Sequence, residues 1–495
     1  MSHPGKGFSR RTLLAGTAGG LAAAALGRRA GAGAAAPIGV DVHCHTFCSA
    51  DLPIVGFVAH QIPGLTELSR LFTRWPEIVV RTLLGAVTTL PNAIAPSGDV
   101  ELTMLRGLTG RPGPPIIPVP PLPPGALDGL LASAAGHLPF SVGAEQRRVV
   151  TRALEALYVT AHGRASIAAT LAQAFPTVSL FTPALVDYDA WSDDRAPTPL
   201  WQQILIQEQI ARLAAAGRVG RPDARFHPFV AFDPRRQVEG HGGGPARPVS
   251  PGPLSSALEL VAYAVESGGF LGVKLYPPVG FAPIDNLPLQ PRLPIATDLD
   301  RALLALYGYC AAGEVPILTH ASASNEYALG LRFLVEPVRW APVLERFPSL
   351  RLNLGHFGGE LRNWTEGAVA LIDRYPNVYA DLSNSALVYD DAYAAQLRTF
   401  LGELWARHPK IKRRLMYGSD WWLSMLDPAA GRAVERFRSV LGGLLSPDET
   451  ADLMGRNALR FLGLLDDQNR PRAGAASRRL HAFYAGAARP AWLAA

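Results

Sequence analysis

The chain has 495 residues, 48% hydrophobic and 18% charged, a globular balance and long enough for one domain with insertions or for two domains. The formal charge of +6 is carried by the ends, since 1–36 hold five basic residues and no acid and 466–495 hold five arginines and two aspartates. The body, 37–465, is therefore slightly acidic at −2, which excludes the clustered Lys and Arg of a nucleic-acid-binding protein.

The N-terminal segment 1–36 is predicted to be a signal rather than part of the fold. Ser9-Arg10-Arg11-Thr12-Leu13-Leu14 resembles a twin-arginine motif, and an Ala/Gly/Leu run with small residues up to Ala36 follows it. The alternative is a disordered basic tail. We expect an exported, periplasmic or extracellular protein that meets the twin-arginine export machinery, and the membrane, only during export.

Apolar runs and cysteines exclude two further classes. No segment after the signal reaches the roughly 18 uninterrupted apolar residues of a membrane span. The three cysteines, Cys44, Cys48 and Cys310, cannot build a disulfide framework. We expect buried thiols, with a Cys44–Cys48 bridge as the alternative.

The first predicted strand, 38–42, ends in two histidines, His43 and His45. Side chains alternate along a strand, so both imidazoles point one way and Cys44 points the other. Two imidazoles on one face are half of a metal site. The alternative is a pair of ordinary polar residues in a loop.

Residues 51–176 lack clear strand patterns. Helices are predicted within 65–90 and 146–175, and 112–124 contain eight prolines in thirteen positions, which favours an extended surface loop. We interpret 51–176 as a helical, Pro-rich insertion that caps the site. A structural clasp and a partner-binding surface are the alternatives.

From residue 177 onward, short apolar strands alternate with helices. The predicted strands are 178–186, 227–232, 271–276, 316–319, 350–354, 377–381 and 414–417, and the helices are 200–215, 254–267, 299–312, 342–347, 365–375 and 394–408. With the first strand this gives eight units, which predict an α/β fold, a (β/α)8 TIM barrel over 37–465, followed by a basic C-terminal tail, 466–495. A doubly wound open sheet is the alternative, but no glycine-rich phosphate loop follows the first strand.

Polar residues end several of the predicted strands, where function gathers in such a barrel. Lys274 lies in the strand 271–276, His320 and His356 follow the next two strands, and Asp420 follows a Gly-Ser turn after the last strand. Each of them alone fits a satisfied core residue. Their shared position, with the histidine pair of the first strand, predicts one common site.

Seven phrases of the sequence, as a set, resemble the amidohydrolase superfamily. They are VDVHCH (40–45), HPFVAFDPRR (227–236), GVKLYPP (272–278), FPSLRLNLGHFGG (347–359), YPNVYADLS (375–383), GSDW (418–421) and RNALRFLGL (456–464). The resemblance is closest to the amidohydrolase-related (amidohydrolase 2) branch that includes aminocarboxymuconate-semialdehyde decarboxylase. It covers about 38–465 apart from the insertion.

The resemblance implies that His43, His45, His320 and Asp420 bind one divalent metal, most often Zn²⁺. Three neutral imidazoles and one carboxylate leave the cation positive, with an open position where water is activated. Asp420 would then accept the proton of that water, and His356 would hydrogen-bond the developing oxyanion.

Lys274 keeps a second arrangement open. In binuclear members of the superfamily, a lysine of the fourth strand is carboxylated and bridges two metals. His320 and His356 would then hold the second metal, and Lys274 would need a buried, neutral amine. The alternatives are a clamp for a substrate carboxylate and a lysine paired with an acid.

Residues beside these positions are candidates for substrate binding. Tyr276 and Trp421 would shape the pocket, or pack beneath the loops. Arg235 and Arg236 follow the third strand and would bind a substrate carboxylate, with a surface salt bridge as the alternative.

Three functions fit this pattern. The first is a metal-dependent hydrolase whose metal-activated water attacks an ester, lactone or amide carbon of a small organic molecule. The second is a metal-dependent decarboxylase, a carbon–carbon lyase, in which the arginines hold the carboxylate. The third is an inactive barrel that binds a ligand, although such a module has no need of five converging strand-end groups.

Overall fold

The structure is a computed structural model of the chain, which divides into two units, 1–36 and 37–495. It describes residues 38–53, 95–121, 155, 158–192, 195–239, 256–289, 293–323, 331–359, 362–385, 388, 390–421 and 432–493. The predicted twin-arginine segment and the predicted helix within 65–90 lie outside the described residues. Among the described helices, none combines the length and apolar character that crossing a bilayer requires.

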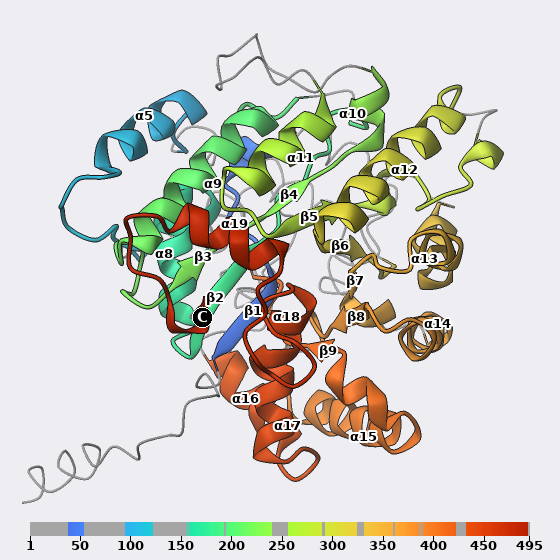
Figure 1. The fold of residues 1–495 in the computed structure, drawn as a ribbon. Coiled ribbons are helices and arrows are strands. Elements are labelled where there is room, and N and C mark those ends of the chain that lie inside the picture. Colours follow the sequence, from blue (N-terminus) through green and yellow to red (C-terminus); the bar gives the residue numbers. More distant parts are fainter. Residues whose placement is uncertain are drawn as a thin grey trace, which may run out of the picture. The chain divides into compact units, whose positions relative to one another are not determined.

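The described strands form two parallel sheets (Figure 1). The first contains β1 (Gly39–Cys44), β2 (Val178–Pro183) and β3 (Arg225–Phe226); the second contains β4 (Phe229–Ala231), β5 (Gly272–Leu275), β6 (Ile317–His320), β7 (Leu352–Gly355), β8 (Val378–Asp381) and β9 (Leu415–Met416). Each of the eight predicted strands overlaps one of these. The predicted strand 227–232 begins too early, because Pro228 has no N–H for the ladder and separates β3 from β4.

Backbone hydrogen bonds join the two sheets on both sides. On one side the Val42 amide donates to the Tyr417 carbonyl at 3.2 Å, next to β9. On the other side the Leu185 amide donates to the Phe229 carbonyl at 3.0 Å, next to β4. The α/β class with parallel strands is thereby confirmed, and the carboxyl ends of the first and last strands lie side by side.

Helices follow the strands along the chain. They are α5 (Gly98–Leu108), α8 (Arg164–Ala174), α9 (Leu200–Ala215), α10 (Pro234–Glu239), α11 (Ala257–Glu266), α12 (Ala296–Gly313), α13 (Ala341–Arg346), α14 (Arg362–Arg374), α15 (Asp391–Arg407), α16 (Ala433–Leu441), α17 (Pro447–Ala451), α18 (Asn457–Phe461) and α19 (Ala475–Phe483). Local chemistry explains their starts: Ser256 and Glu259 form a capping box at α11, and Pro447 occupies the first turn of α17.

The C-terminal segment after residue 465 packs against the strands. Helix α19 and the short helix Ala491–Leu493 bury Leu480, Tyr484 and Trp492 in one apolar cluster with Val40 of β1. Arg472 pairs with Glu314 at 2.5 Å and holds the start of this segment to the end of α12. The basic charge of 466–495 therefore belongs to a segment that contributes to the core.

A buried network of ion pairs joins three described segments of the predicted insertion to one another, and the Arg164 guanidinium also donates to Thr198 outside it at 2.7 Å. Arg164, at the start of α8, is fully buried and contacts Asp51 at 2.6 Å and Glu101 of α5 at 2.5 Å. Removing one partner of such a network leaves an uncompensated buried charge, which costs about 3–5 kcal/mol. These contacts favour a structural clasp as one role of the insertion.

Candidate metal centre

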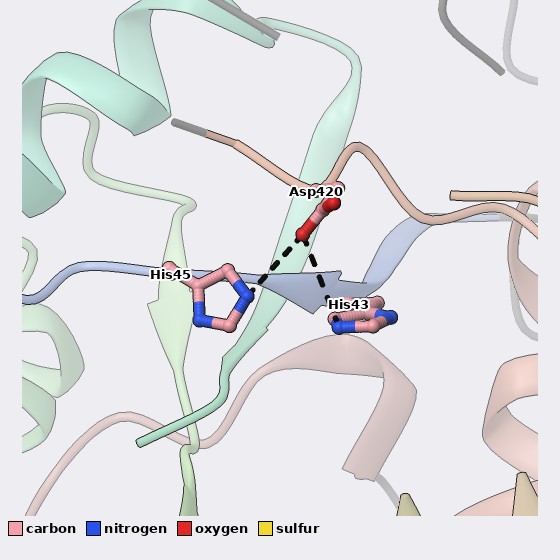
Figure 2. A group of neighbouring side chains, drawn as sticks. All are labelled: His43, His45 and Asp420. Carbon is pink, nitrogen blue, oxygen red and sulfur yellow. Dashed lines mark ion pairs between the residues drawn. The ribbon is translucent and has the colours of Figure 1, made fainter. Parts of the chain in front are cut away.

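The carboxyl ends of β1 and β9 bring His43, His45 and Asp420 together (Figure 2). His45 Nε2 lies 3.2 Å from Asp420 Oδ1, and His43 Nε2 lies 4.0 Å from the same oxygen. One ligand atom of each residue lies within 4.8 Å of the others. The alternation of β1 side chains produces this, because it turns both imidazoles toward one face and buries Cys44 on the other.

The turn that carries Asp420 is held in a conformation uncommon for a non-glycine residue. Asp420 has a φ of 47°, and its amide donates to the His43 carbonyl at 2.8 Å. The Ser419 hydroxyl and amide donate to the buried carboxylate of Asp41 at 2.6 and 3.0 Å. The strained residue is therefore fixed by β1 itself, and strain of this kind clusters at functional sites.

The partners of the two imidazoles decide which nitrogens are free. His45 Nδ1 lies 2.9 Å from the Ala184 carbonyl, which only accepts, so Nδ1 carries the proton. His43 Nδ1 likewise faces the carboxylate of Asp381 at 3.1 Å. Both Nε2 atoms therefore carry lone pairs on the side of Asp420 Oδ1, and the amine of Lys274 is the donor that faces the lone pair of His43, with Nζ 3.0 Å away. Acceptors converge in this way favourably only around a proton or a cation, so the donor set fits a divalent metal ion.

Asp420 itself is buried and ionised. Burial alone would raise the pKa of its carboxyl, but the imidazoles of His45, His356 and His43, when protonated, hold that pKa below its ordinary value. A carboxylate that stays charged under burial can serve both as a cation ligand and as a proton acceptor.

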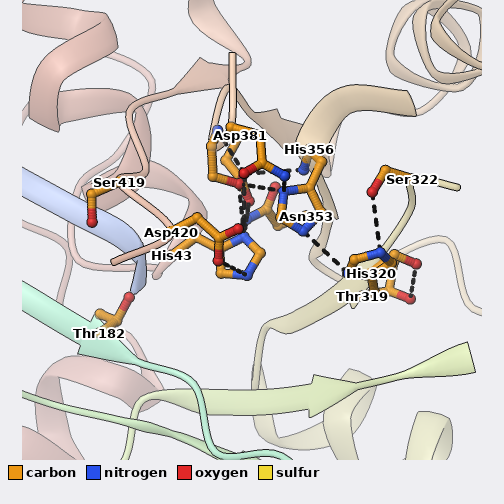
Figure 3. Close-up of polar contacts among 12 residues, drawn as sticks. His43, Thr182, Thr319, His320, Ser322, Asn353, His356, Asp381, Ser419 and Asp420 are labelled. Carbon is orange, nitrogen blue, oxygen red and sulfur yellow. Dashed lines mark hydrogen bonds and ion pairs between the residues drawn. The ribbon is translucent and has the colours of Figure 1, made fainter. Parts of the chain in front are cut away.

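Asp381, at the end of β8, accepts hydrogen bonds that orient several residues of the site (Figure 3). The sequence analysis did not name it as a site residue. This fully buried carboxylate accepts from His43 Nδ1, from Asn353 Nδ2 at 2.8 Å and from the His356 amide at 3.1 Å. The Ser383 amide and hydroxyl also donate to it. Burial would raise the pKa of Asp381, but its contacts with His43 lower it below the ordinary range. Its position as the last residue of a predicted strand was the available signal.

His320 and His356 form a second part of the site (Figure 3). Hydrogen bonds to Asp381 and Ser383 link this part to the first. His356 Nδ1 lies 2.8 Å from Ser383 Oγ, and His356 Nε2 lies 3.1 Å from His320 Nδ1. Since the Ser383 hydroxyl donates to Asp381, His356 donates to Ser383 and accepts from His320. His320 Nε2 is then the nitrogen left with a lone pair, 3.1 Å from the Ser322 hydroxyl.

Lys274 of β5 lies directly beside the cluster. Its side chain is 1% exposed, and Nζ is 3.0 Å from His43 Nε2, the nitrogen that a metal would use. Burial lowers the pKa of Lys274 to about 8, although Asp381 and Asp420 partly oppose the shift. The structure thus places a readily neutralised amine at the centre.

The four predicted substrate-binding residues have different surroundings. Arg236 pairs with Asp187 at 2.7 Å, and Arg235 pairs with Glu239 at 2.7 Å. The ring of Tyr276 lies 4.8 Å from that of His320, centroid to centroid. Trp421 is buried, and its carbonyl accepts from the His45 amide at 2.7 Å. Both arginines are therefore already engaged in ion pairs, and both aromatic residues adjoin histidines of the site.

A parallel α/β fold with a buried His–Asp cluster at the carboxyl ends of its strands defines a class of candidate metalloenzymes. A family model described as Amidohydrolase matches residues 167–464, more than half of the chain. The chain therefore belongs to the amidohydrolase family, and membership supports an enzyme with metal-dependent hydrolase or lyase activity. The match includes His320, His356 and Asp420, and it begins after the histidine pair of β1.

Solved structures similar to this chain include an amidohydrolase of Burkholderia multivorans crystallised with bound HEPES, at 15% identity over 59% of this chain and 86% of that one, with a TM-score of 0.36. A candidate 2-pyrone-4,6-dicarboxylic acid hydrolase of Pseudomonas putida is 17% identical over 59% and 84%, with a TM-score of 0.34. A candidate metal-dependent hydrolase of Lactobacillus casei is 13% identical over 86% and 94%, with a TM-score of 0.37. At these scores the likenesses support no conclusion about substrate. No curated protein matches the chain.

Proposed function

We propose that this protein is a hydrolase in which water, activated by a divalent metal with Zn²⁺ first among the candidates, would attack an ester, lactone or amide carbon of a small organic substrate. The observation that carries the proposal is the convergence of the Nε2 atoms of His43 and His45 and one carboxylate oxygen of Asp420 in a largely buried cluster. Membership of the amidohydrolase family supports it.

The proposed architecture is a closed (β/α)8 barrel. The hydrogen bonds from Val42 to Tyr417 and from Leu185 to Phe229 support closure, since they join the two sheets on both sides. Closure would bring the carboxyl ends of all strands to one mouth, which is where barrel enzymes hold their active sites.

His43, His45 and Asp420 would hold the cation in this proposal. His320, the fourth ligand that the resemblance implies, contacts His356 and Ser322 in the second part of the site and belongs to neither group of described residues whose ligand atoms converge within 4.8 Å. A cation bound there would supply Lewis acidity, which lowers the pKa of a coordinated water from 15.7 to about 7. Asp381 and the Ala184 carbonyl support ligation by fixing the tautomers of His43 and His45.

The remaining chemistry is assigned to the side chains themselves. Asp420 accepts the proton of the attacking water at its carboxylate and later returns it to the leaving group. His356 stands between His320 and Ser383, where it can exchange a proton and bond the substrate oxygen. Lys274 would either bond the substrate or, once its neutral amine is carboxylated by carbon dioxide, help to hold a second metal.

Hydrolysis is favoured over decarboxylation by the partners of the two arginines. A carboxy-lyase of the expected type would use Arg235 and Arg236 to hold the departing carboxylate. Arg235 already pairs with Glu239, and its guanidinium lies 5.3 Å from the ring of Trp191. Arg236 already pairs with Asp187 and Asp189.

The test combines metal analysis with turnover. We expect one divalent ion per chain, hydrolysis of at least one member of a panel of esters, lactones and amides, loss of this activity on chelation and its return with Zn²⁺. An intact-mass measurement detects a carboxyl group on Lys274. Carbon dioxide release from a carboxylic acid panel would indicate the lyase instead. If the His356→Asn variant still binds ligand but no longer turns over substrate, the protein is not merely a binding module. A purified chain that contains no metal and hydrolyses none of the panel would contradict the proposal.

The proposed location is outside the cytoplasm, after export through the twin-arginine pathway. The supporting motif, Arg10-Arg11, lies outside the described residues and rests on the sequence alone. Fractionation of cells that express the whole chain, compared with an Arg10→Lys, Arg11→Lys variant, tests it. Retention of both proteins in the cytoplasm would contradict export.

A further inference from the structure

Asp41 of β1 is a fully buried carboxylate, and no ion pair among the described residues includes it. It lies two residues before His43, so the alternation of strand side chains places it on the face of His43 and His45. Taking a carboxylate out of water without a cation beside it costs stability. A role in stability alone therefore does not explain Asp41, and its contacts show what else it does.

The Asp41 carboxylate accepts hydrogen bonds only from residues that carry or flank the candidate ligands. Oδ2 accepts from the Ser419 hydroxyl at 2.6 Å, and Oδ1 accepts from the amides of Ser419 and His43 at 3.0 and 3.4 Å. The same Ser419 hydroxyl accepts from the Trp421 amide at 3.1 Å. One hydroxyl thus ties the residues on both sides of Asp420 to Asp41.

The turn around Asp420 needs such an anchor. Asp420 has a φ of 47°, in the left-handed region, where a side chain beyond Cα is unfavourable and the surrounding structure must hold the backbone. In this conformation its Oδ1 lies 3.2 Å from His45 Nε2 and 4.0 Å from His43 Nε2. A turn that relaxed toward negative φ would carry the carboxylate away from the two imidazoles.

We propose that Asp41 is a positioning residue for the candidate metal centre, which acts through Ser419 to hold Asp420 in the conformation that turns its carboxylate toward His43 and His45. Asp41 belongs to neither group of converging ligand atoms, so it acts through the turn. Its effect on metal affinity rests on the proposed function, whereas its hold on the turn is a property of the metal-free chain.

Chelator competition titrations with Zn²⁺ test the effect on affinity. At pH 8.5 the carboxyl of Asp41, whose pKa burial raises to about 7, is ionised. We expect Ser419→Ala to bind Zn²⁺ about tenfold more weakly, the lower end of the usual effect of a residue that orients a metal ligand. Asp41→Asn should lose about as much, because an NH2 group cannot accept from the Ser419 hydroxyl.

The double variant tests whether Asp41 acts through Ser419. Because the two residues share one hydrogen bond, Asp41→Asn combined with Ser419→Ala should also lose only about tenfold. Unchanged affinity in Ser419→Ala would overturn the proposal. A loss of about a hundredfold in the double variant would overturn it as well, because the two residues would then act independently.

Thr182→Val is the matched control. Thr182 of β2 is fully buried, and its hydroxyl donates to the Asp41 carbonyl at 3.3 Å, on the other side of β1 from Ser419 (Figure 3). The variant removes a buried hydrogen bond of Asp41 but none of the turn. We expect it to bind Zn²⁺ as wild type does. A tenfold loss here would show that any loosening of β1 weakens the site, and would overturn the proposal.

Amide hydrogen exchange of the metal-free chain, read by mass spectrometry, tests the turn itself. The amides of Ser419, Asp420 and Trp421 all donate to protein acceptors, so a peptide that covers 417–421 should exchange slowly in wild type. It should exchange faster in Ser419→Ala and Asp41→Asn, whereas a peptide that covers β7 should not change. Equal acceleration of both peptides would indicate general destabilisation and contradict the proposal.

The two measurements separate this inference from the proposed function. A wild-type chain that binds no Zn²⁺ contradicts the proposed function, and the exchange of the turn still decides whether Asp41 holds Asp420. A wild-type chain that binds Zn²⁺ and hydrolyses a panel substrate, with unchanged affinity in Ser419→Ala and Asp41→Asn, contradicts only this inference.

Discussion

The two ends of the same parallel strands hold buried histidines with opposite roles. At the carboxyl end, His43 and His45 each use Nδ1 for a protein acceptor and leave Nε2 facing Asp420. At the amino end of β4, His227 bonds the Gly269 carbonyl at 2.7 Å through Nδ1 and the Tyr484 hydroxyl at 2.8 Å through Nε2. Both nitrogens of His227 are satisfied, so it fastens the C-terminal segment and offers nothing to a ligand.

A perturbed pKa does not separate the two ends. Burial is the largest cause at both, and it lowers the pKa of His43 and of His227 to about 4. The difference lies in the surrounding groups: carboxylates converge at the carboxyl end, whereas His227 lies among the aromatic rings of Phe483, Tyr484 and Trp492. Convergence of potential ligand atoms from several residues, rather than burial of a histidine, marks the candidate site.

The largest expected effect is at the carboxyl end. Asp420→Asn should lower kcat/KM on any hydrolysed panel substrate by about 10³-fold, because the proton acceptor is lost. Steady-state kinetics with matched metal loading measures it, and His227→Gln is the control that should stay near the wild-type rate. Equal losses in the two variants would erase the distinction between the ends.

The second effect is a loss of folding stability at low pH that comes from His227, at the amino end of β4. Because the pKa of His227 falls from 6.5 unfolded to about 4 folded, the unfolded chain takes up a proton first as the pH drops. The contribution of His227 to stability should be constant above pH 6.5 and decline by about 3 kcal/mol between pH 6.5 and 4. Urea unfolding of wild type and His227→Gln at pH 7 and 4.5 checks this; the variant should lose less stability over this interval. Parallel losses would show that other groups carry the acid sensitivity.

The third effect tests whether Asp381 serves the site or only the fold. Asp381→Asn removes the carboxylate that orients His43, so metal affinity should fall about 10- to 100-fold. A chelator competition titration of the purified variant gives the affinity, and circular dichroism reports its folding. An intact fold with unchanged affinity would reduce Asp381 to a structural residue.

The smallest effect lies in the C-terminal segment. Hydrogen bonds from Arg472 are the largest cause that lowers the pKa of Glu314, to about 2, so this pair stabilises the fold above about pH 4.5 and the contribution is lost toward pH 2. Both side chains are about one-third exposed, so solvent screening limits the contribution to about 1 kcal/mol or less. Glu314→Gln should lower the unfolding free energy at pH 6 and not at pH 2.5. A loss of equal size at both pH values would point to packing.

The strands were predictable because their signal is local. Short apolar runs before His43, His320 and His356 end within two residues of the observed strands, and parallel strands place their ends together whatever the remaining sequence is. The sequence did not predict the break at Pro228. A residue without an amide hydrogen interrupts a strand only where a neighbouring strand would accept that hydrogen bond.

The roles of Asp381, Arg235 and Arg236 were not predictable in the same way. Asp381 and Arg236 depend on partners distant in the chain, since Asp381 lies 338 residues from His43 and Arg236 lies 49 residues from Asp187. Arg235 pairs with Glu239, four residues along α10, and the sequence does not show whether that local pair forms. A lone sequence shows that an arginine follows a strand but not whether an acid already neutralises it.

The sequence by itself determined the order of strands and helices, the alternation that turns His43 and His45 to one face, and the family to which the chain belongs. Periodicity and residue type suffice for these, because neighbouring residues produce them. Tertiary structure alone decided which nitrogens are free, which arginines are already paired and which turn the carboxylate of Asp41 holds. Hydrogen bonding and desolvation depend on atoms a few ångströms away in space, and only the folded chain brings those atoms together.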